Sequence, residues 1–180
     1  MTRLFTSSGY LDADDDRSPF PLETVPAFLR VLLSTDGTVT KSLESYFWEP
    51  VAVINCGQSY QTLSADAPVI ERRVGDRVLR RSVKLMGKKT GTCYAMATSL
   101  ICTEQLSQQL RTDLDAGVMG IGELLRECGL ETYREIVAIG EGNGGESLAA
   151  SDSLWRTYRI VMAHQPFIQI SEFFPLAVYR

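Results

Sequence analysis

Residues 167–175 read Phe167-Ile168-Gln169-Ile170-Ser171-Glu172-Phe173-Phe174-Pro175, with apolar side chains at every second position from Ile168 to Phe174 except Glu172. Side chains of a β-strand point alternately to its two faces, so Glu172 shares a face with Ile168, Ile170 and Phe174. We therefore expect this segment to be a β-strand that directs one carboxylate into an apolar layer. Because a buried charge is unfavourable without compensation, Glu172 needs a partner or a ligand.

A second segment, residues 77–86, has the same feature with the opposite charge. Arg81 alternates there with Leu79, Val83 and Leu85. Two interpretations remain open from the pattern alone. Arg81 and Glu172 form a buried salt bridge with each other, or they line a cavity in which Arg81 binds a ligand carboxylate while Glu172 binds a hydroxyl or moves a proton.

Other candidate binding residues lie on a third predicted strand and at two predicted helix starts. Arg159 alternates with Val161 and Ala163, and a third charge of this kind favours a cavity for a small anion. The segments Thr38-Val39-Thr40-Lys41 and Ile121-Gly122-Glu123 can offer free backbone N–H groups. An ordinary N-cap or turn explains both segments equally well.

The remaining periodicity predicts an α+β fold. Amphipathic helices are expected from Val25 to Leu33 and after Thr38, with a short helix that starts at residues 103–106 and another at residues 121–129. We expect strands at residues 51–55, 77–86, 93–102, 133–139, 154–162 and 167–175, and a short β segment at 69–70. Since short links join the strands, we predict one antiparallel sheet of about six strands flanked by helices.

Composition limits the function classes. The 180 residues are 44% hydrophobic, and the net charge of −4 gives no general attraction to nucleic acid or to anionic membranes. No apolar run approaches the roughly 20 residues that cross a bilayer, and no signal peptide is recognisable. We expect a cytoplasmic protein with no nucleic-acid or membrane partner, and a monomer is favoured over an oligomer.

Cysteine and histidine usage gives no sign of a metal or redox centre. The four cysteines form no C-x-x-C pair, and the single histidine, His164, lies at a predicted hairpin turn. We expect no metal and no cofactor. Residues 1–22 include Asp12-Ala13-Asp14-Asp15-Asp16 and show neither the helical nor the strand period of hydrophobic residues. We predict that they form an irregular acidic arm before one domain at residues 23–180.

Four groups of motifs occur in order over roughly residues 24–180: Leu33 through Glu44, Arg80 through Leu85, Met119 through Leu125, and Tyr158-Arg159-Ile160 together with Pro166 through Pro175. Together they resemble the chorismate pyruvate-lyase (4-hydroxybenzoate synthase) family, especially its cyanobacterial and plastid-type branch. The resemblance implies a chorismate lyase-like fold with an internal ligand cavity, closed by two helical flaps. We expect these flaps near Thr38 and over Gly117 to Gly122.

The resemblance also implies an activity and a set of site residues. Chorismate is converted to 4-hydroxybenzoate and pyruvate without a cofactor. Arg81 matches the family's arginine at the ring carboxylate, and Glu172 matches its glutamate at the ring hydroxyl. The backbone N–H groups of Val39 and Ile121 match further carboxylate-binding positions, although the side chains there differ from those of the best-studied members.

The expected mechanism removes the proton from the hydroxyl-bearing ring carbon and expels the neighbouring enolpyruvyl oxygen. Glu172, desolvated among apolar side chains, is expected to act as base or hydroxyl anchor. Arg159 and Lys41 are expected to bind the second carboxylate. Thr38 is expected to be a further substrate-binding residue. The alternative is a non-catalytic module of the same fold that binds a small aromatic acid, and a third possibility is a structural protein with an Arg81–Glu172 ion pair.

Overall fold

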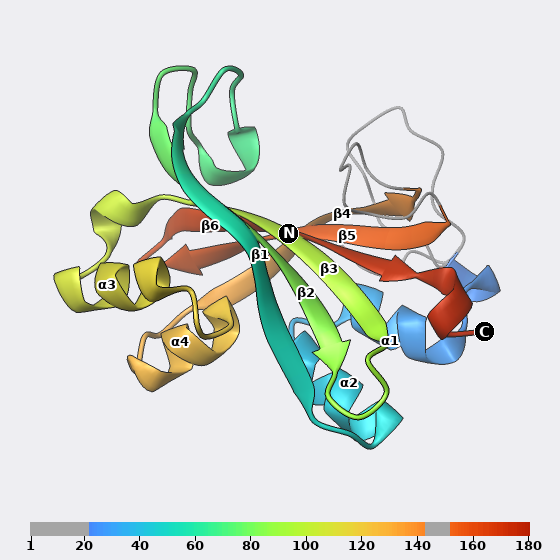
Figure 1. Cartoon of the computed structure of the whole chain (residues 1–180). Helices are drawn as coiled ribbons and strands as arrows, with labels where there is room; N and C mark the ends of the chain where they lie inside the picture. Colours follow the sequence, from blue (N-terminus) through green and yellow to red (C-terminus); the bar gives the residue numbers. More distant parts are fainter. Residues whose placement is uncertain (1–21, 143–151) are drawn as a thin grey trace.

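A computed structural model describes residues 22–142 and 152–180 and shows one antiparallel sheet of six strands (Figure 1). The strand order is β1-β2-β3-β6-β5-β4, so β1 and β4 form the two edges and β6 lies between β3 and β5. The prediction of an α+β fold with about six antiparallel strands is confirmed. The strands are β1 (Val51–Thr62), β2 (Arg77–Gly87), β3 (Cys93–Ile101), β4 (Tyr133–Glu141), β5 (Ser153–Met162) and β6 (Gln165–Pro175).

Four α-helices and four short 3₁₀ turns accompany the sheet within the described residues. The α-helices are α1 (Ala27–Ser34), α2 (Val39–Phe47), α3 (Gln108–Ala116) and α4 (Ile121–Glu127), and the turns are η1 (Leu22–Thr24), η2 (Pro68–Ile70), η3 (Thr103–Gln105) and η4 (Leu176–Val178).

Two local predictions were wrong. Residues 69–70 lie in η2 rather than in a β segment, because Pro68 starts a tight turn that ends at Glu71 in the left-handed conformation. Residues 103–106 form only the turn η3, and a separate helix, α3, follows. The side chain of Ser107 caps α3 by accepting a hydrogen bond from the Leu110 N–H.

The β5–β6 hairpin confirms the prediction for the single histidine. Met162 pairs with Gln165, so the turn consists of Ala163 and His164. Their φ angles are 48° and 64°, and positive φ at both central residues is what a type I′ hairpin turn requires. His164 is exposed there.

The strand register divides the helix-covered face of the sheet into three zones. At one end, the row Leu79–Ile101–Ile168–Ile160 packs with leucines of α3 and α4. At the other end, Leu85, Ala95, Leu154 and Phe174 pack with leucines of α1 and α2. Figure 1 shows the two helix pairs beside opposite ends of the strands. The rows between these two hydrophobic clusters carry Arg81, Arg156 and Glu172.

The predicted acidic arm, residues 1–22, lies outside the described residues except for Leu22, which is buried in η1. Within the part of the chain that the structure describes, no helix is long and apolar enough to cross a membrane.

Candidate functional site

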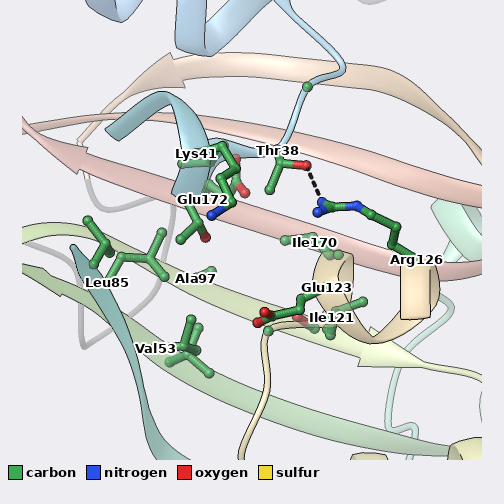
Figure 2. Close-up of a pocket in the computed structure, with 18 of the residues that line it drawn as sticks. Thr38, Lys41, Val53, Leu85, Ala97, Ile121, Glu123, Arg126, Ile170 and Glu172 are labelled. Carbon is green, nitrogen blue, oxygen red and sulfur yellow. Dashed lines mark hydrogen bonds between the residues drawn. The ribbon is translucent and has the colours of Figure 1, made fainter. Parts of the chain in front are cut away.

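A pocket of about 460 Å³ lies between the sheet and the segments that begin α2 and α4 (Figure 2). All six strands contribute lining residues, and Thr38 faces Ile121 and Glu123 across the opening. The volume lies within the usual range for small-molecule sites, about 300 to 1,000 Å³. The pocket is partly open in this structure, and the closed cavity that the family resemblance implies stays a prediction.

Arg81 lines the pocket from β2 although only 1% of its surface is exposed. Its Nη2 donates to the carbonyl oxygens of Gly117, at 3.1 Å, and Met119, at 2.7 Å. Its Nε is buried and has no hydrogen-bond partner in the described part of the chain. Burial lowers the pKa of Arg81 from its ordinary value, but a guanidinium remains charged in proteins. The site therefore contains a buried cation with an unused donor.

Glu172 lines the pocket from β6 and is held by two side chains of β5. Arg156 Nε donates to Glu172 Oε2 at 2.7 Å, and the Tyr158 hydroxyl donates to Oε1 at 3.1 Å. Arg156 also donates from Nη1 to the carbonyl oxygen of Thr35, 2.5 Å away, at the end of α1. Burial is the main reason that the pKa of Tyr158 lies far above its ordinary value, so this hydroxyl acts as a donor.

Glu172 therefore belongs to a buried salt bridge, but its partner is Arg156 and not Arg81. Arg81 pairs with Ser99 on β3, and Ser99 pairs with Ile170 on β6, so two strand spacings of about 4.8 Å separate Arg81 from the strand of Glu172. The structure places the two charges at separate positions of one pocket. It does not join them as an ion pair.

The structure does not bring Arg159 into the pocket, so its predicted position is wrong. The Arg159 side chain is 32% exposed and binds Glu135 at 2.5 Å, with Glu71 at 3.8 Å. The pattern grouped Arg159 with Val161, but a register shift between Ile160 and Val161 interrupts the alternation. The burial of Val161 therefore gives no information about the face of Arg159.

Arg156 is the site residue that sequence reasoning missed. It alternates on β5 with Leu154, Tyr158 and Ile160, which are all buried. A charged residue in an apolar alternation is the same signal that identified Arg81 and Glu172. Applied to residues 154–160, it would have found Arg156.

The N-terminal ends of helices α2 and α4 both border the pocket, where the sequence pattern predicted them. Val39 and Ile121 are the first residues of α2 and α4, and both line the pocket. Thr38 is the N-cap of α2, yet its side chain makes no capping bond. Its hydroxyl instead accepts a 3.0 Å hydrogen bond from Arg126 Nη2 of α4, which joins the two segments across the opening (Figure 2).

Positive charge predominates in the lining. The basic residues are Lys41, Arg81, Lys88, Arg126 and Arg134, and the acidic ones are Glu44, Glu123 and Glu172. Lys41 lines the rim with its side chain 70% exposed and pairs with Glu44 at 3.0 Å. Because Arg156 compensates Glu172, the pocket keeps an excess of positive charge that suits a small dianion.

Comparison with known families and proteins points to one enzyme class. The family model described as "Chorismate pyruvate-lyase Rv2949c-like" matches residues 33–180. A chorismate pyruvate-lyase of Mycobacterium leprae is 30% identical over 84% of this chain and 76% of its own length. That of Mycobacterium tuberculosis is 26% identical over 84% of this chain and 81% of its own. These names do not address the cyanobacterial and plastid-type branch, which stays a prediction.

Solved structures share the fold at low identity. The effector domain of PhnF from Mycobacterium smegmatis superposes with a TM-score of 0.58 and 17% identity, covering 78% of this chain and 90% of that domain. The possible transcriptional regulator YydK from Bacillus subtilis gives a TM-score of 0.53 at 11% identity, covering 79% of this chain and 64% of YydK. At such identity the likeness concerns the fold alone.

Proposed function

Because the chain belongs to the Rv2949c-like chorismate pyruvate-lyase family, we propose that it eliminates pyruvate from chorismate to give 4-hydroxybenzoate. The reaction takes place in the pocket between the sheet and helices α2 and α4. One observation supports this most directly: Arg81 and Glu172 line the same pocket without being each other's partner. A ring with a carboxylate at one end and a hydroxyl at the other fits this arrangement.

Arg81 binds the ring carboxylate. Its guanidinium is buried, makes hydrogen bonds only to carbonyl oxygens within the described residues, and keeps an unused Nε–H. A ligand carboxylate supplies both the missing counter-charge and the missing acceptor, in the geometry that a planar guanidinium favours. The N–H groups of Val39 and Ile121, at the starts of α2 and α4, add donors from the two helices that face the sheet.

Glu172 binds the ring hydroxyl. Its two oxygens each accept one hydrogen bond, from Arg156 and Tyr158, and these bonds fix the orientation of the carboxylate. Each oxygen keeps further acceptor capacity for the substrate hydroxyl. Glu172 is also the carboxylate positioned at this end of the ring to accept the proton from the carbon that bears the hydroxyl.

The elimination breaks two bonds that join ring carbons to their substituents. The carbon–hydrogen bond next to the hydroxyl releases its proton, and the neighbouring carbon–oxygen bond breaks so that its electron pair leaves on the enolpyruvyl oxygen. The ring becomes aromatic, and the departing enolate takes up a proton to become pyruvate. Since aromatisation drives the reaction, the protein contributes mainly by positioning the ring and excluding water.

The test is to incubate the protein with chorismate and to follow 4-hydroxybenzoate by absorbance and pyruvate by a coupled assay. We expect both products in equal amounts. Glu172→Gln should lower kcat/KM by about 10²-fold or more, because the amide can neither accept the proton nor compensate Arg156. Glu104→Gln, at an exposed position of η3 outside the pocket, is the matched control and should retain activity.

The results separate this proposal from its alternative. Tight binding of 4-hydroxybenzoate without turnover would replace the lyase by a non-catalytic module that binds aromatic acids. Unchanged pyruvate release by Glu172→Gln would remove Glu172 from the reaction. If wild-type protein neither converts chorismate nor binds 4-hydroxybenzoate, the proposed function is rejected.

A further inference from the structure

We propose that Arg134 binds the second carboxylate of the substrate, the one on the leaving enolpyruvyl group. It thereby makes the pocket selective for a dicarboxylate over a monocarboxylate. This inference rests on the proposed function and assigns to Arg134 of β4 the role that the sequence pattern gave to Arg159 and Lys41.

The Arg134 side chain is a pocket cation with no partner among the described residues. It lines the pocket from β4, the edge strand opposite β1, and is partly buried. Within residues 22–142 and 152–180 its guanidinium makes no hydrogen bond and no ion pair. Arg81 and Arg126, the other arginines of the lining, bind carbonyl oxygens and the Thr38 hydroxyl.

The guanidinium of Arg134 lies beside the first turn of α4 and within electrostatic range of Tyr158. Its Nη2 lies 3.4 Å from the position that a Cβ atom on Gly122 would occupy, so the guanidinium ends against the first turn of α4. Its charge also acts on the Tyr158 hydroxyl, where it opposes the rise in the pKa of that group. Tyr158 in turn donates to Glu172. The enolpyruvyl ether is attached next to the ring hydroxyl, so its carboxylate lies on this side.

Arg81 and Arg134 approach the substrate from opposite sides. They stand on β2 and β4, four strand spacings apart, which corresponds to about 19 Å between the backbones. Their long side chains nevertheless reach the same segment, because Arg81 binds the Gly117 and Met119 carbonyls and Arg134 ends beside Gly122. One molecule with two carboxylates can therefore engage both guanidinium groups.

The remaining lysines of the lining are less suitable for the second carboxylate. Lys41 is paired with Glu44 and mostly exposed, and Lys88 is exposed on the β2–β3 turn. Charges of this kind are weakened by solvent and salt. Glu123 also lines the pocket, and its carboxylate points towards the side of Val53 on β1 (Figure 2).

The test compares two ligands that differ in the second carboxylate. For Arg134→Gln we expect kcat/KM for chorismate to fall about 10- to 100-fold, because a charge-assisted bond is lost, while the dissociation constant of 4-hydroxybenzoate stays within about twofold. Arg134→Lys keeps the charge without the planar guanidinium, so its kcat/KM for chorismate should lie between those of wild type and Arg134→Gln. Arg73→Gln, an exposed arginine outside the pocket, is the matched control and should change neither quantity.

The inference is tested by comparing the effect of each variant on kcat/KM for chorismate with its effect on the dissociation constant of 4-hydroxybenzoate. Arg81→Gln should weaken both ligands, because both carry the ring carboxylate. If Arg134→Gln weakens both ligands equally, or neither, then Arg134 does not bind the second carboxylate, although the lyase activity still stands. If wild-type protein forms no 4-hydroxybenzoate and does not bind it, the proposed function itself fails. Thermal unfolding of each variant shows that a loss of affinity is not a loss of folding.

Discussion

Arg156→Met removes a guanidinium that is 1% exposed and binds both the Glu172 carboxylate and the Thr35 carbonyl. Methionine retains most of the apolar stem, so the main change is that the Glu172 charge stays buried with the Tyr158 hydroxyl as its remaining hydrogen-bond donor among the described residues. Breaking a buried ion pair in this way costs about 3 to 5 kcal/mol of unfolding free energy.

A matched variant on the same strand provides the comparison. Arg159 stands three residues after Arg156, but its side chain is 32% exposed and its pair with Glu135 is reached by solvent. Since such pairs contribute about 0 to 1 kcal/mol, Arg159→Met should cost little. Urea denaturation of both variants measures the two free energies directly, and unchanged m-values would show that the unfolded states are comparable.

A double-mutant cycle identifies the interaction responsible. Arg156→Met combined with Glu172→Gln should cost less than the sum of the single variants, with a coupling of about 0.5 to 3 kcal/mol. Strict additivity would mean that the 2.7 Å contact contributes no energy of its own. A cost for Arg156→Met no larger than that for Arg159→Met would refute the argument that burial decides the strength of this pair.

Substitutions at Glu49 and at Gly140 test two further contacts that stabilise the fold, with Gly37→Ala as a control. Hydrogen bonds from Tyr94 and from the β2–β3 turn lower the pKa of Glu49 from 4.5 to about 2, so the stability that its charge provides is present above pH 4.5 and is lost as the pH falls towards 2. Glu49→Gln should therefore lower the Tm at pH 7, and the difference from wild type should shrink over that range; a constant difference would contradict this. Gly140→Ala should cost about 1 to 3 kcal/mol, because its Cβ would stand 2.6 Å from the Trp155 ring. Gly37→Ala, with no atom within 4 Å of the added Cβ, should be close to neutral in the same denaturation assay.

The alternation of residues along β2 and β6 was sufficient to place two site residues. Arg81 and Glu172 each interrupt an apolar face, and both line the pocket. Short-range patterns succeed here because every second side chain of a strand points to the same face. The same alternation gave the wrong face for Arg159, because the register shift beside Val161 depends on pairing with β6 and is not visible in β5 alone.

Other parts of the site depend on contacts between distant segments. Thr38 was predicted to begin a helix, and it does, but the partner of its hydroxyl is Arg126, which lies 88 residues away. In the same way, Arg134 enters the pocket only because β4 is placed at the edge of the sheet, where its side chain can reach the first turn of α4. Strand order is a property of the whole chain, so periodicity within one strand cannot supply it.

The final strand, β6, illustrates what local sequence and tertiary contacts each contribute. Local alternation is sufficient to predict that residues 167–175 form a strand and that Glu172 faces an apolar layer. The identity of the cation that compensates Glu172 depends instead on how the strands are arranged. The strand order sets β5 directly beside β6 and leaves β3 between β6 and β2, so Arg156 reaches the carboxylate and Arg81 remains available for a ligand.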